Sequence, residues 1–541
     1  MKNILSIFAI ALILVNTGCA DFLEEDNRSN VTAEEFYATE EGYAALINSN
    51  YSALRNIYGK APWMFMSGTD LYEEGRSPEP QGLSKYSQLN SSSEGVDFLY
   101  TNSYKAIQLA NTAIYYADKT APSPNIAQYV GEVRFLRANA YFLLVQSYGG
   151  VGIITDFIAE PILSFDRSSA EEVYSLIISE LEIAMNEVSF GDYTGRVNKR
   201  AVENLLAKVH LTRAYEDFAE SDDFAKAASY AENVIAGQGL NLSSEELWTP
   251  GNDMNEEVIF SVQFSPGSIS SDPSEIGNQQ QNYNGPYLGG SEVAGNAPYK
   301  TYNLLPTRFA LDLFEETDER WYSTFMTEMY VRYYDYYDVA DKSSLTVRDF
   351  YEPRWFTAQD SIDYMAAHPT AIYHSYGTTD PVGGIISGDR ATMIVKKFDD
   401  PNSLFAGSGN GSSTRDFIIS RLAETYLVAA EAYLGLGEAA KGLEKLNVVR
   451  QRAGVADATM SDFDLDYILD ERARELLGEN HRWFDLKRTG KLIERASAYN
   501  SWITPANFQG AGGNLKILRP IPQAALDLNQ NKDFPQNPAY D

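Results

Sequence analysis

The sequence predicts a mainly α-helical protein: a tetratricopeptide-like scaffold of four helix pairs with a long, irregular, loop-rich insertion. Three observations indicate this class. Apolar residues recur at spacings of three and four near both ends of the chain, as on amphipathic helices. Residues 417–452 form one helix–glycine–helix unit of about the 34-residue period expected of a tetratricopeptide repeat. Between residues 240 and 416 this periodicity gives way to short apolar runs separated by Gly, Pro, Asn and Ser.

Residues 1–18 are expected to be a secretory signal. Lys2 precedes an apolar stretch over residues 4–15, which is too short to span a membrane. Cys19 follows directly and is the only cysteine, so it cannot form a disulfide within the chain. Its position resembles the lipobox of bacterial lipoproteins, although Asn16 stands where an aliphatic residue is usual. We expect Cys19 to be acylated; the alternative is a signal peptide removed further downstream.

Residues 19–40 are expected to form an acidic tether between the lipid and the folded body. Each methylene of an acyl chain contributes about 0.8 kcal/mol when it is buried in a bilayer, so several chains on Cys19 can anchor the protein. The acidic residues that follow resemble the surface-export signal of Bacteroidetes lipoproteins, and they also suit an ordinary mobile N-terminus.

The charge of the chain limits its partners. It has 43 Lys and Arg residues against 75 Asp and Glu residues, a net charge of −32. Nucleic acids and anionic lipid surfaces are therefore not expected to bind. The composition fits an extracellular surface that meets neutral or weakly charged ligands.

The periodic segments divide into four helix pairs, three within residues 41–239 and one at the start of residues 417–541. Stacked pairs bury a continuous core and present an extended surface. In the fourth pair, small residues would let the helices approach closely, namely Ala429, Ala430, Ala432 and Ala440. The expected helices are residues 41–57 with 96–119, 125–148 with 169–188, 199–218 with 224–236, and 417–436 with 438–452.

Residues 240–416 are predicted to be an insertion with few regular elements. Loops of this length inside a compact protein are uncommon unless they are functional or disordered. The many aromatic residues of the segment argue against disorder. We therefore expect the insertion to contribute ligand surface.

Several short motifs suggest cofactor or metal chemistry but stand in the wrong context. Residues 435–440 match a relaxed dinucleotide-binding pattern, yet they follow a predicted helix instead of a strand. Residues 462–466 alternate Asp like the start of a calcium loop, but the glycine is missing, and a helix N-terminus is the preferred interpretation. The four histidines include no pair at zinc-ligand spacing on one helix. No cofactor and no metal ion are expected.

Hydrolytic chemistry finds little support in the sequence. A glycoside hydrolase needs only two suitably separated carboxylates, which a sequence cannot test. Glu73 and Glu74 beside Tyr72 are the most suggestive pair, and a solvated loop is the preferred interpretation. Gly-x-Ser-x-Gly and Walker motifs are absent from the sequence. We do not expect an enzyme.

Several segments, in order along the chain, carry motifs of one family. They include residues 21–37, 132–151, 421–432 and 520–540. The most specific is Glu471-Arg472-Ala473-Arg474-Glu475-Leu476, followed by Glu479 and by Arg482-Trp483-Phe484-Asp485-Leu486. Together these segments resemble the SusD/RagB family of nutrient-binding outer-membrane lipoproteins across nearly the whole mature chain. Gly478 and Asn480 depart from the pattern, since the family more often has Phe and Gly there.

The resemblance implies a surface-exposed lipoprotein of the cell outer membrane, with a ligand surface made by loops and a SusC-like TonB-dependent transporter as partner. Members mostly bind glycans, whereas the RagB branch handles peptides. The expected function is therefore capture of oligosaccharides and their delivery to the transporter. Capture of peptides and glycoside hydrolysis are the alternatives.

The charged residues of the best-matched motif alternate in sign at helical spacings. Such a pattern suits ion pairs between packed helices, and bidentate Arg–carboxylate contacts can fix how two elements dock. We therefore interpret Glu471, Arg472, Arg474, Glu475, Arg482 and Asp485 as structural.

The ligand-binding residues are expected in two loop segments, residues 63–86 and 282–302. Sugar rings present a face of C–H groups ringed by hydroxyls, so a binder needs flat aromatic platforms beside amide and carboxylate groups. Trp248, Trp321 and Trp483 adjoin family-type segments and are assigned to packing. Each predicted contact residue could instead pack beneath a loop. The predicted contact residues are Trp63, Tyr283 and Tyr287 as part of a stacking platform, Asp70, Asn282 and Asn284 as hydrogen-bonding partners, and Tyr72, Tyr299 and Trp355 as further ligand contacts.

Overall fold

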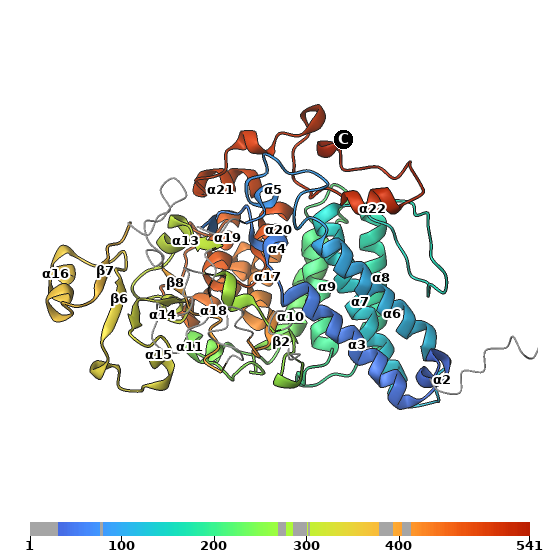
Figure 1. The fold of residues 1–541 in the computed structure, drawn as a ribbon, viewed down its shortest axis with the longest axis horizontal. Helices are drawn as coiled ribbons and strands as arrows, with labels where there is room; N and C mark the ends of the chain where they lie inside the picture. The colour runs from blue at the N-terminus through green and yellow to red at the C-terminus, as the bar shows by residue number, and fades with distance from the viewer. Residues whose placement is uncertain are drawn as a thin grey trace, which may run out of the picture.

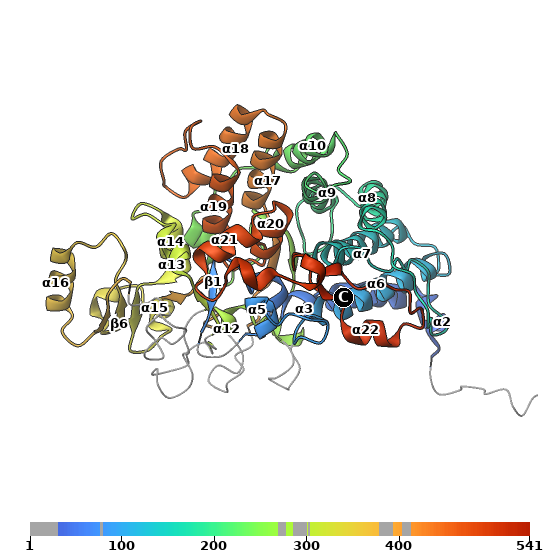
Figure 2. The ribbon, with the colours of Figure 1, turned by 90° about the horizontal axis from the view of Figure 1, so that it is seen from above.

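The computed structural model describes residues 31–75, 79–268, 277–284, 300, 303–377, 393–402 and 413–541. Long helices run side by side through one end of the molecule, and the short strands and helices of the insertion make up the other end (Figure 1). Helices α17 to α20 lie between the two, as Figure 2 also shows from above. The predicted class, a mainly helical scaffold of tetratricopeptide type, is confirmed.

The three helix pairs predicted in the N-terminal part are present. Each helix packs on the next, which gives the stacked arrangement of a repeat scaffold. Helix α9 ends at Arg213, short of the boundary predicted at residue 218. A short helix, α2 (Ala33–Tyr37), precedes the pairs, which are α3 (Glu40–Tyr58) with α6 (Phe98–Ala117), α7 (Ile126–Tyr148) with α8 (Ala170–Glu187), and α9 (Lys199–Arg213) with α10 (Asp223–Ile235).

Local sequence signals fix where these helices begin. Ser169 and Glu172 form a capping box at the start of α8, in which each side chain accepts the other residue's backbone N–H. Asn198 caps α9 by accepting the N–H of Ala201 at 3.0 Å. The helix α7 is buried on nearly all sides because α6 and α8 cover it, which explains why its apolar residues are not confined to one face.

The fourth pair begins differently from the prediction. Residues Phe417–Arg421 form strand β9, which pairs antiparallel with β2 (Val258–Val262), and α17 starts only at Leu422. All five residues of β9 are buried, and its apolar residues Phe417, Ile418 and Ile419 stand just before α17, so periodicity cannot separate the strand from the start of a buried helix. Helices α17 (Leu422–Gly435) and α18 (Ala439–Arg452) then form the predicted unit.

A glycine, not Ala440, lets α17 and α18 approach. Ala440 is exposed, which corrects its predicted role. A Cβ on Gly442 would lie 2.7 Å from the carbonyl oxygen of Ala430, so only glycine fits between the helices there. The turn between them contains Gly437 in the left-handed conformation, with φ +74°. Ala429, Ala430 and Ala432 are buried as expected.

Four further helices follow. They are α19 (Leu465–Glu475), α20 (Arg482–Arg488), α21 (Leu492–Tyr499) and α22 (Gln523–Leu528). Asp464 caps α19 by accepting the N–H of Tyr467 at 2.8 Å, which confirms the helix N-terminus predicted for residues 462–466. Among the residues that the structure describes, no helix is both long and apolar enough to cross a bilayer.

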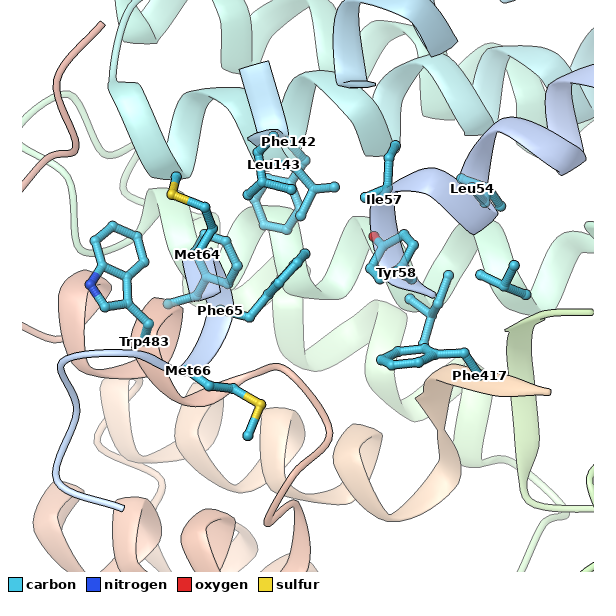
Figure 3. Close-up of a cluster of buried hydrophobic side chains, with 14 of the residues drawn as sticks. Leu54, Ile57, Tyr58, Met64, Phe65, Met66, Phe142, Leu143, Phe417 and Trp483 are labelled. Carbon is cyan, nitrogen blue, oxygen red and sulfur yellow. The ribbon is translucent and has the colours of Figure 1, made fainter. Parts of the chain in front are cut away.

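One large core joins the two ends of the chain. Trp483 of α20 is fully buried in a cluster with α4 (Trp63–Met66). Phe65 packs edge-on against Phe484, with ring centroids 5.8 Å apart, and also meets Tyr58 at 5.8 Å. Figure 3 shows Phe65, Tyr58 and Trp483 within this cluster. The core thereby holds α4, and the loop segment around it, in a fixed position.

The insertion contains more regular structure than predicted, although each element is short. Its helices are α11 (Ser244–Trp248), α12 (Gln280–Tyr283), α13 (Arg308–Asp312), α14 (Glu319–Thr324), α15 (Asp335–Asp338) and α16 (Ala358–Ala367). Strand β1 (Tyr72–Glu74) pairs with β3 (Leu304–Pro306), and β4 (Phe325–Met326) pairs with β8 (Ile394–Val395). Strands β5 (Glu328–Tyr330), β6 (Val347–Tyr351) and β7 (Ile372–His374) form a mixed three-stranded sheet.

Candidate ligand-binding site

Trp63 and Tyr283, predicted from two different segments, meet as an aromatic pair. Their ring centroids lie 4.9 Å apart, and the ring planes make an angle of 74°. Trp63 is the first residue of α4 and Tyr283 the last of α12, and both side chains are half-buried. We call this pair the aromatic corner. Tyr287, the third predicted member of the platform, lies outside the described residues.

Amide contacts fix the position of the corner. The backbone N–H of Gln279 donates to the carbonyl oxygen of Gly59 at 3.0 Å, just after α3 ends, and the side chain of Gln280 donates to the carbonyl oxygen of Gly478 at 2.9 Å. The Tyr283 hydroxyl donates to Oε1 of Gln279 at 3.3 Å. Burial raises the pKa of Tyr283 to about 12, so this hydroxyl stays protonated. Neither glutamine was predicted from the sequence, although both belong to the amide-rich run before Tyr283.

A polar cluster lies on the next short helix, α5 (Gln81–Lys85). Glu74 accepts hydrogen bonds from Gln81 at 2.9 Å and forms an ion pair with Lys85 at 2.8 Å. The ammonium of Lys85 lies 4.0 Å from the ring centroid of Trp502, a half-buried tryptophan that the sequence analysis did not single out. Leu83 of the same helix and Trp63 both lie against Gly95, so the cluster adjoins the aromatic corner.

Asp70 is a correction to the predicted set. It is fully buried and accepts hydrogen bonds from Arg482 at 2.8 and 2.6 Å and from Arg495 at 3.0 Å. Burial alone would raise the pKa of Asp70, but the two guanidinium groups outweigh this effect and hold the pKa below its usual value. The carboxylate is committed to an internal ion cluster and does not face a ligand.

Three more predicted contact residues are turned into the protein. Tyr72 is 1% exposed and belongs to β1, opposite Pro306 of β3. Asn282 is 6% exposed, and Asn284 is 1% exposed with its amide donating to the carbonyl oxygen of Gln280 at 3.2 Å. These three side chains pack beneath the loops, which was the alternative to ligand contact.

Trp355 remains a candidate apart from the corner. Its ring is half-buried, lies edge-on to Trp321 at 5.0 Å, and approaches Tyr322 at 6.4 Å. Trp321 and Trp483 are fully buried, which confirms their assignment to packing, and Trp248 packs edge-on against Phe398 at 5.4 Å. The predicted residues Tyr299 and Cys19 lie outside the described residues.

The carboxylate pair considered for hydrolysis belongs to strand β1 and not to a solvated loop. Glu73 is 5% exposed and accepts the N–H of Ser501 at 2.7 Å. Glu74 is the carboxylate of the polar cluster with Lys85. Both groups therefore have structural partners. In the described ranges, no group of three or more His, Cys, Asp or Glu residues is arranged to hold a metal ion.

The charged motif predicted to be structural forms a buried ion network. Glu471 pairs with Arg320 at 2.6 Å, and Glu475 pairs with Arg421 at 2.6 Å. Arg472 donates to Asp485 at 2.7 Å, which ties α19 to α20. All of these side chains are buried, so the prediction of a helix-docking network is confirmed.

Comparison with known families identifies the chain. Its sequence matches the model of the SusD family over residues 256–540. The chain belongs to the SusD family. A second model, described as starch-binding and associating with the outer membrane, matches residues 21–211 of this SusD-family protein.

Relatives match the SusD-family protein along most of its length. The SusD-like protein P25 of Formosa agariphila is 25% identical over 559 residues, which cover 96% of each chain. A SusD-like protein of Bacteroides ovatus is 25% identical over 517 residues, covering 90% of this chain and 82% of the relative.

Solved structures show the same fold. A laminarin binding SusD-like protein superposes with a TM-score of 0.70 at 24% identity, over 93% of this chain and 100% of its own. A SusD homolog from Bacteroides thetaiotaomicron gives a TM-score of 0.73 at 20% identity, over 95% of this chain and 100% of its own.

Proposed function

We propose that this SusD-family protein captures oligosaccharides and passes them, uncut, to a SusC-like TonB-dependent transporter. The observation that supports capture is the aromatic corner, a half-exposed pair of rings held by amide contacts and bordered by polar side chains. The C–H face of a sugar stacks on such rings while neighbouring polar groups bind its hydroxyls. The name of the laminarin-binding neighbour further supports a glycan as the ligand.

We also propose that the protein is displayed on the outer membrane through acylated Cys19. The family model described as associating with the outer membrane supports this location. The transporter is the partner that the family resemblance implies. Mass spectrometry of membrane proteins that co-purify with the tagged chain tests this: a TonB-dependent transporter among them supports delivery, and recovery of the chain alone contradicts it.

Trp63→Ala and Tyr283→Ala should each weaken glycan binding about tenfold, a loss of about 1.4 kcal/mol, because each removes one face of the corner. The measurement is affinity electrophoresis of the mature chain against a polysaccharide panel, followed by calorimetry on the polymer that retains it. Phe190→Ala is the matched control, since this ring is 82% exposed and pairs with no other ring among the residues that the structure describes.

Three results would count against the proposal. Unchanged affinity in both corner variants, with intact folding, removes the corner from the binding site. Recovery of shortened polymer chains indicates a hydrolase. Retention of peptides, with no polysaccharide retained, indicates the peptide-capturing branch of the family.

A further inference from the structure

A polar pocket of about 200 Å³ lies beside the C-terminal part of α3. It is bounded by α3, by the turn at residues 195–196 and by β2, and it is several times larger than the ~30 Å³ that a water molecule occupies in the liquid. Two of its lining residues, Arg55 of α3 and Arg196 of the turn, bring guanidinium groups to this one small cavity. Its polar side chains are Asn48, Ser52, Arg55, Arg196, Ser261 and Gln263.

One wall of this pocket depends on a glycine. Gly195 has φ +92°, a conformation that residues with a side chain rarely adopt. A Cβ at this position would lie 1.9 Å from Nε2 of Gln263. A side chain at this position would therefore displace the amide of Gln263, which lines the pocket, and strain the turn.

The guanidinium of Arg196 is fixed and its charge is compensated. Its Nε donates to Oε1 of Glu132 at 3.0 Å, and its Nη1 donates to Oδ1 of Asn48 at 3.2 Å. The same group lies 5.1 Å from the ring centroids of Tyr51 and Tyr129. Arg196 thus forms a rigid wall and leaves little charge for a ligand.

The charge of Arg55 is compensated less directly, through the nearby Asp416. Its Nε donates to the carbonyl oxygen of Gln263 at 2.9 Å, and the guanidinium lies 5.5 Å from the centroid of Phe264. Within the described part of the chain, its terminal nitrogens meet no acceptor and it forms no ion pair. The facing acid is Asp416, which accepts the N–H of Phe264 at 2.9 Å and whose pKa burial raises to about 7. The terminal N–H groups of Arg55 are available to an anion.

We propose that this pocket binds a carboxylate or sulfate group carried by an acidic unit of the captured oligosaccharide. A guanidinium matches such groups because its planar donors contact two oxygens at once. The inference rests on the proposed function and adds the chemical class of the glycan. The net charge of −32 repels polyanions, so the fitting ligand is an otherwise neutral glycan with isolated acidic groups.

The pocket and the aromatic corner share one end of α3. Arg55 lies in the last turn of α3, and Trp63 opens α4 shortly afterwards. The segment that leads into Tyr283 is tied to the same place, because Gln279 donates to Gly59 directly after α3. Figure 2 shows α12 near this end of α3. A glycan stacked on the corner can therefore reach the pocket with a neighbouring unit.

Matched polysaccharides that differ only in acidic substituents test the proposal. The mature chain is run in affinity electrophoresis against pairs such as glucuronoxylan with unsubstituted xylan, and sulfated with unsulfated galactan. We expect stronger retention by the acidic member of a pair, and at least a fivefold loss of that advantage in Arg55→Ala. Arg55→Lys keeps the charge without the paired donors and should retain part of the advantage.

Two further variants keep the test decisive if Arg55→Ala fails to fold. Ser52→Asp places a carboxylate one helical turn from Arg55 on the exposed side of α3 and should abolish the preference while folding normally. Arg332→Ala, at a 43% exposed arginine distant in sequence, should change nothing.

The outcomes separate the pocket from the proposed function. Equal retention of neutral and acidic members, unchanged in Arg55→Ala and Ser52→Asp, overturns the anion subsite and leaves glycan capture standing. Binding of inorganic sulfate that depends on Arg55, without any preference for acidic polymers, overturns the assignment to a sugar-borne group. Retention of no polysaccharide at all overturns glycan capture and the subsite with it.

Discussion

Asp70 joins segments of the chain that are separated by more than four hundred residues. It follows α4 closely in sequence, while its partners Arg482 and Arg495 belong to α20 and α21. All three side chains are buried. An unpaired charge in the protein interior costs far more free energy than a paired one, so the stability of this cluster depends on the carboxylate of Asp70. The residue therefore stabilises the loop segment that carries Trp63 without touching a ligand.

Asp70→Asn should lower the free energy of unfolding by about 3–5 kcal/mol, because it leaves the buried guanidinium of Arg482 without a carboxylate, while Arg495 keeps Asp466 and Asp470. Urea unfolding followed by fluorescence measures this change. Asp97→Asn, at an exposed position, is the control and should stay within about 0.5 kcal/mol of the wild type. Calorimetry on the folded variant should give unchanged glycan affinity. A loss of affinity at unchanged stability would return Asp70 to the ligand-binding residues.

Residue composition predicted the aromatic corner, but it did not predict whether the polar residues around it face a ligand or the protein interior. Trp63 and Tyr283 stand out because large rings in polar loop segments have few structural reasons to be there. Asp70 has the same local setting, and only its distant arginine partners decide its role. Arg55 was missed for the opposite reason: an arginine near the end of a predicted helix looks like a solvated residue until β2 and the turn at residues 195–196 close around it.

At the scale of elements, the ion network of α19 sets how the C-terminal helices dock. Glu471 meets Arg320, Arg450 and Arg474 at 2.6 to 2.8 Å. Burial would raise the pKa of Glu471, but these three guanidinium groups outweigh it and lower the pKa to about 2. The folded state thus binds the ionised form of this carboxylate more strongly than the unfolded chain does.

This pKa predicts a loss of stability in acid. A carboxyl whose folded pKa is depressed stabilises the fold above its unfolded value, near 4.5, and loses that contribution as the pH falls toward 2. Glu471→Gln should therefore be less stable than the wild type at pH 7, by on the order of 3 kcal/mol. The difference should narrow below pH 4.5, as followed by urea unfolding from pH 7 to pH 3. Glu94→Gln, an exposed control, should match the wild type throughout. A difference independent of pH contradicts the assignment.

Element boundaries were predictable where one physical signal dominated. The helices of the first three pairs, apart from the end of α9, lie close to their predicted ranges because each is long and its apolar residues recur at helical spacings. Strand β9 was misassigned because it is buried on both faces and leads directly into α17. The short strands of the insertion pair with partners far along the chain, as β1 does with β3, and no local pattern reveals such partners.

At the scale of the whole molecule, the start of the folded body and the aromatic corner lie apart. The described residues begin just before α2, which lies at the outer end of the helical body (Figure 1), whereas α4 of the aromatic corner lies near the middle of the whole molecule. A net charge of −32 gives the body no attraction to anionic lipid. We therefore propose attachment through the N-terminal segment, with the aromatic corner acting away from the bilayer.

Cys19→Ser should release the protein from membranes, because it removes the proposed acylation site, and each buried methylene of an acyl chain contributes about 0.8 kcal/mol to anchoring. Cell fractionation at high salt, with incorporation of a labelled fatty acid, measures the change. The released chain should fold normally and keep its glycan affinity, since the aromatic corner and Arg55 belong to the folded body. Asn16→Leu, which completes the lipobox, is the control and should remain in the membrane fraction. If Cys19→Ser stays with the membrane and still takes up the labelled fatty acid, another residue carries the lipid. If it stays with the membrane without taking up the label, the anchor is a protein partner. Stripping that partner from the membrane should then release both variants alike.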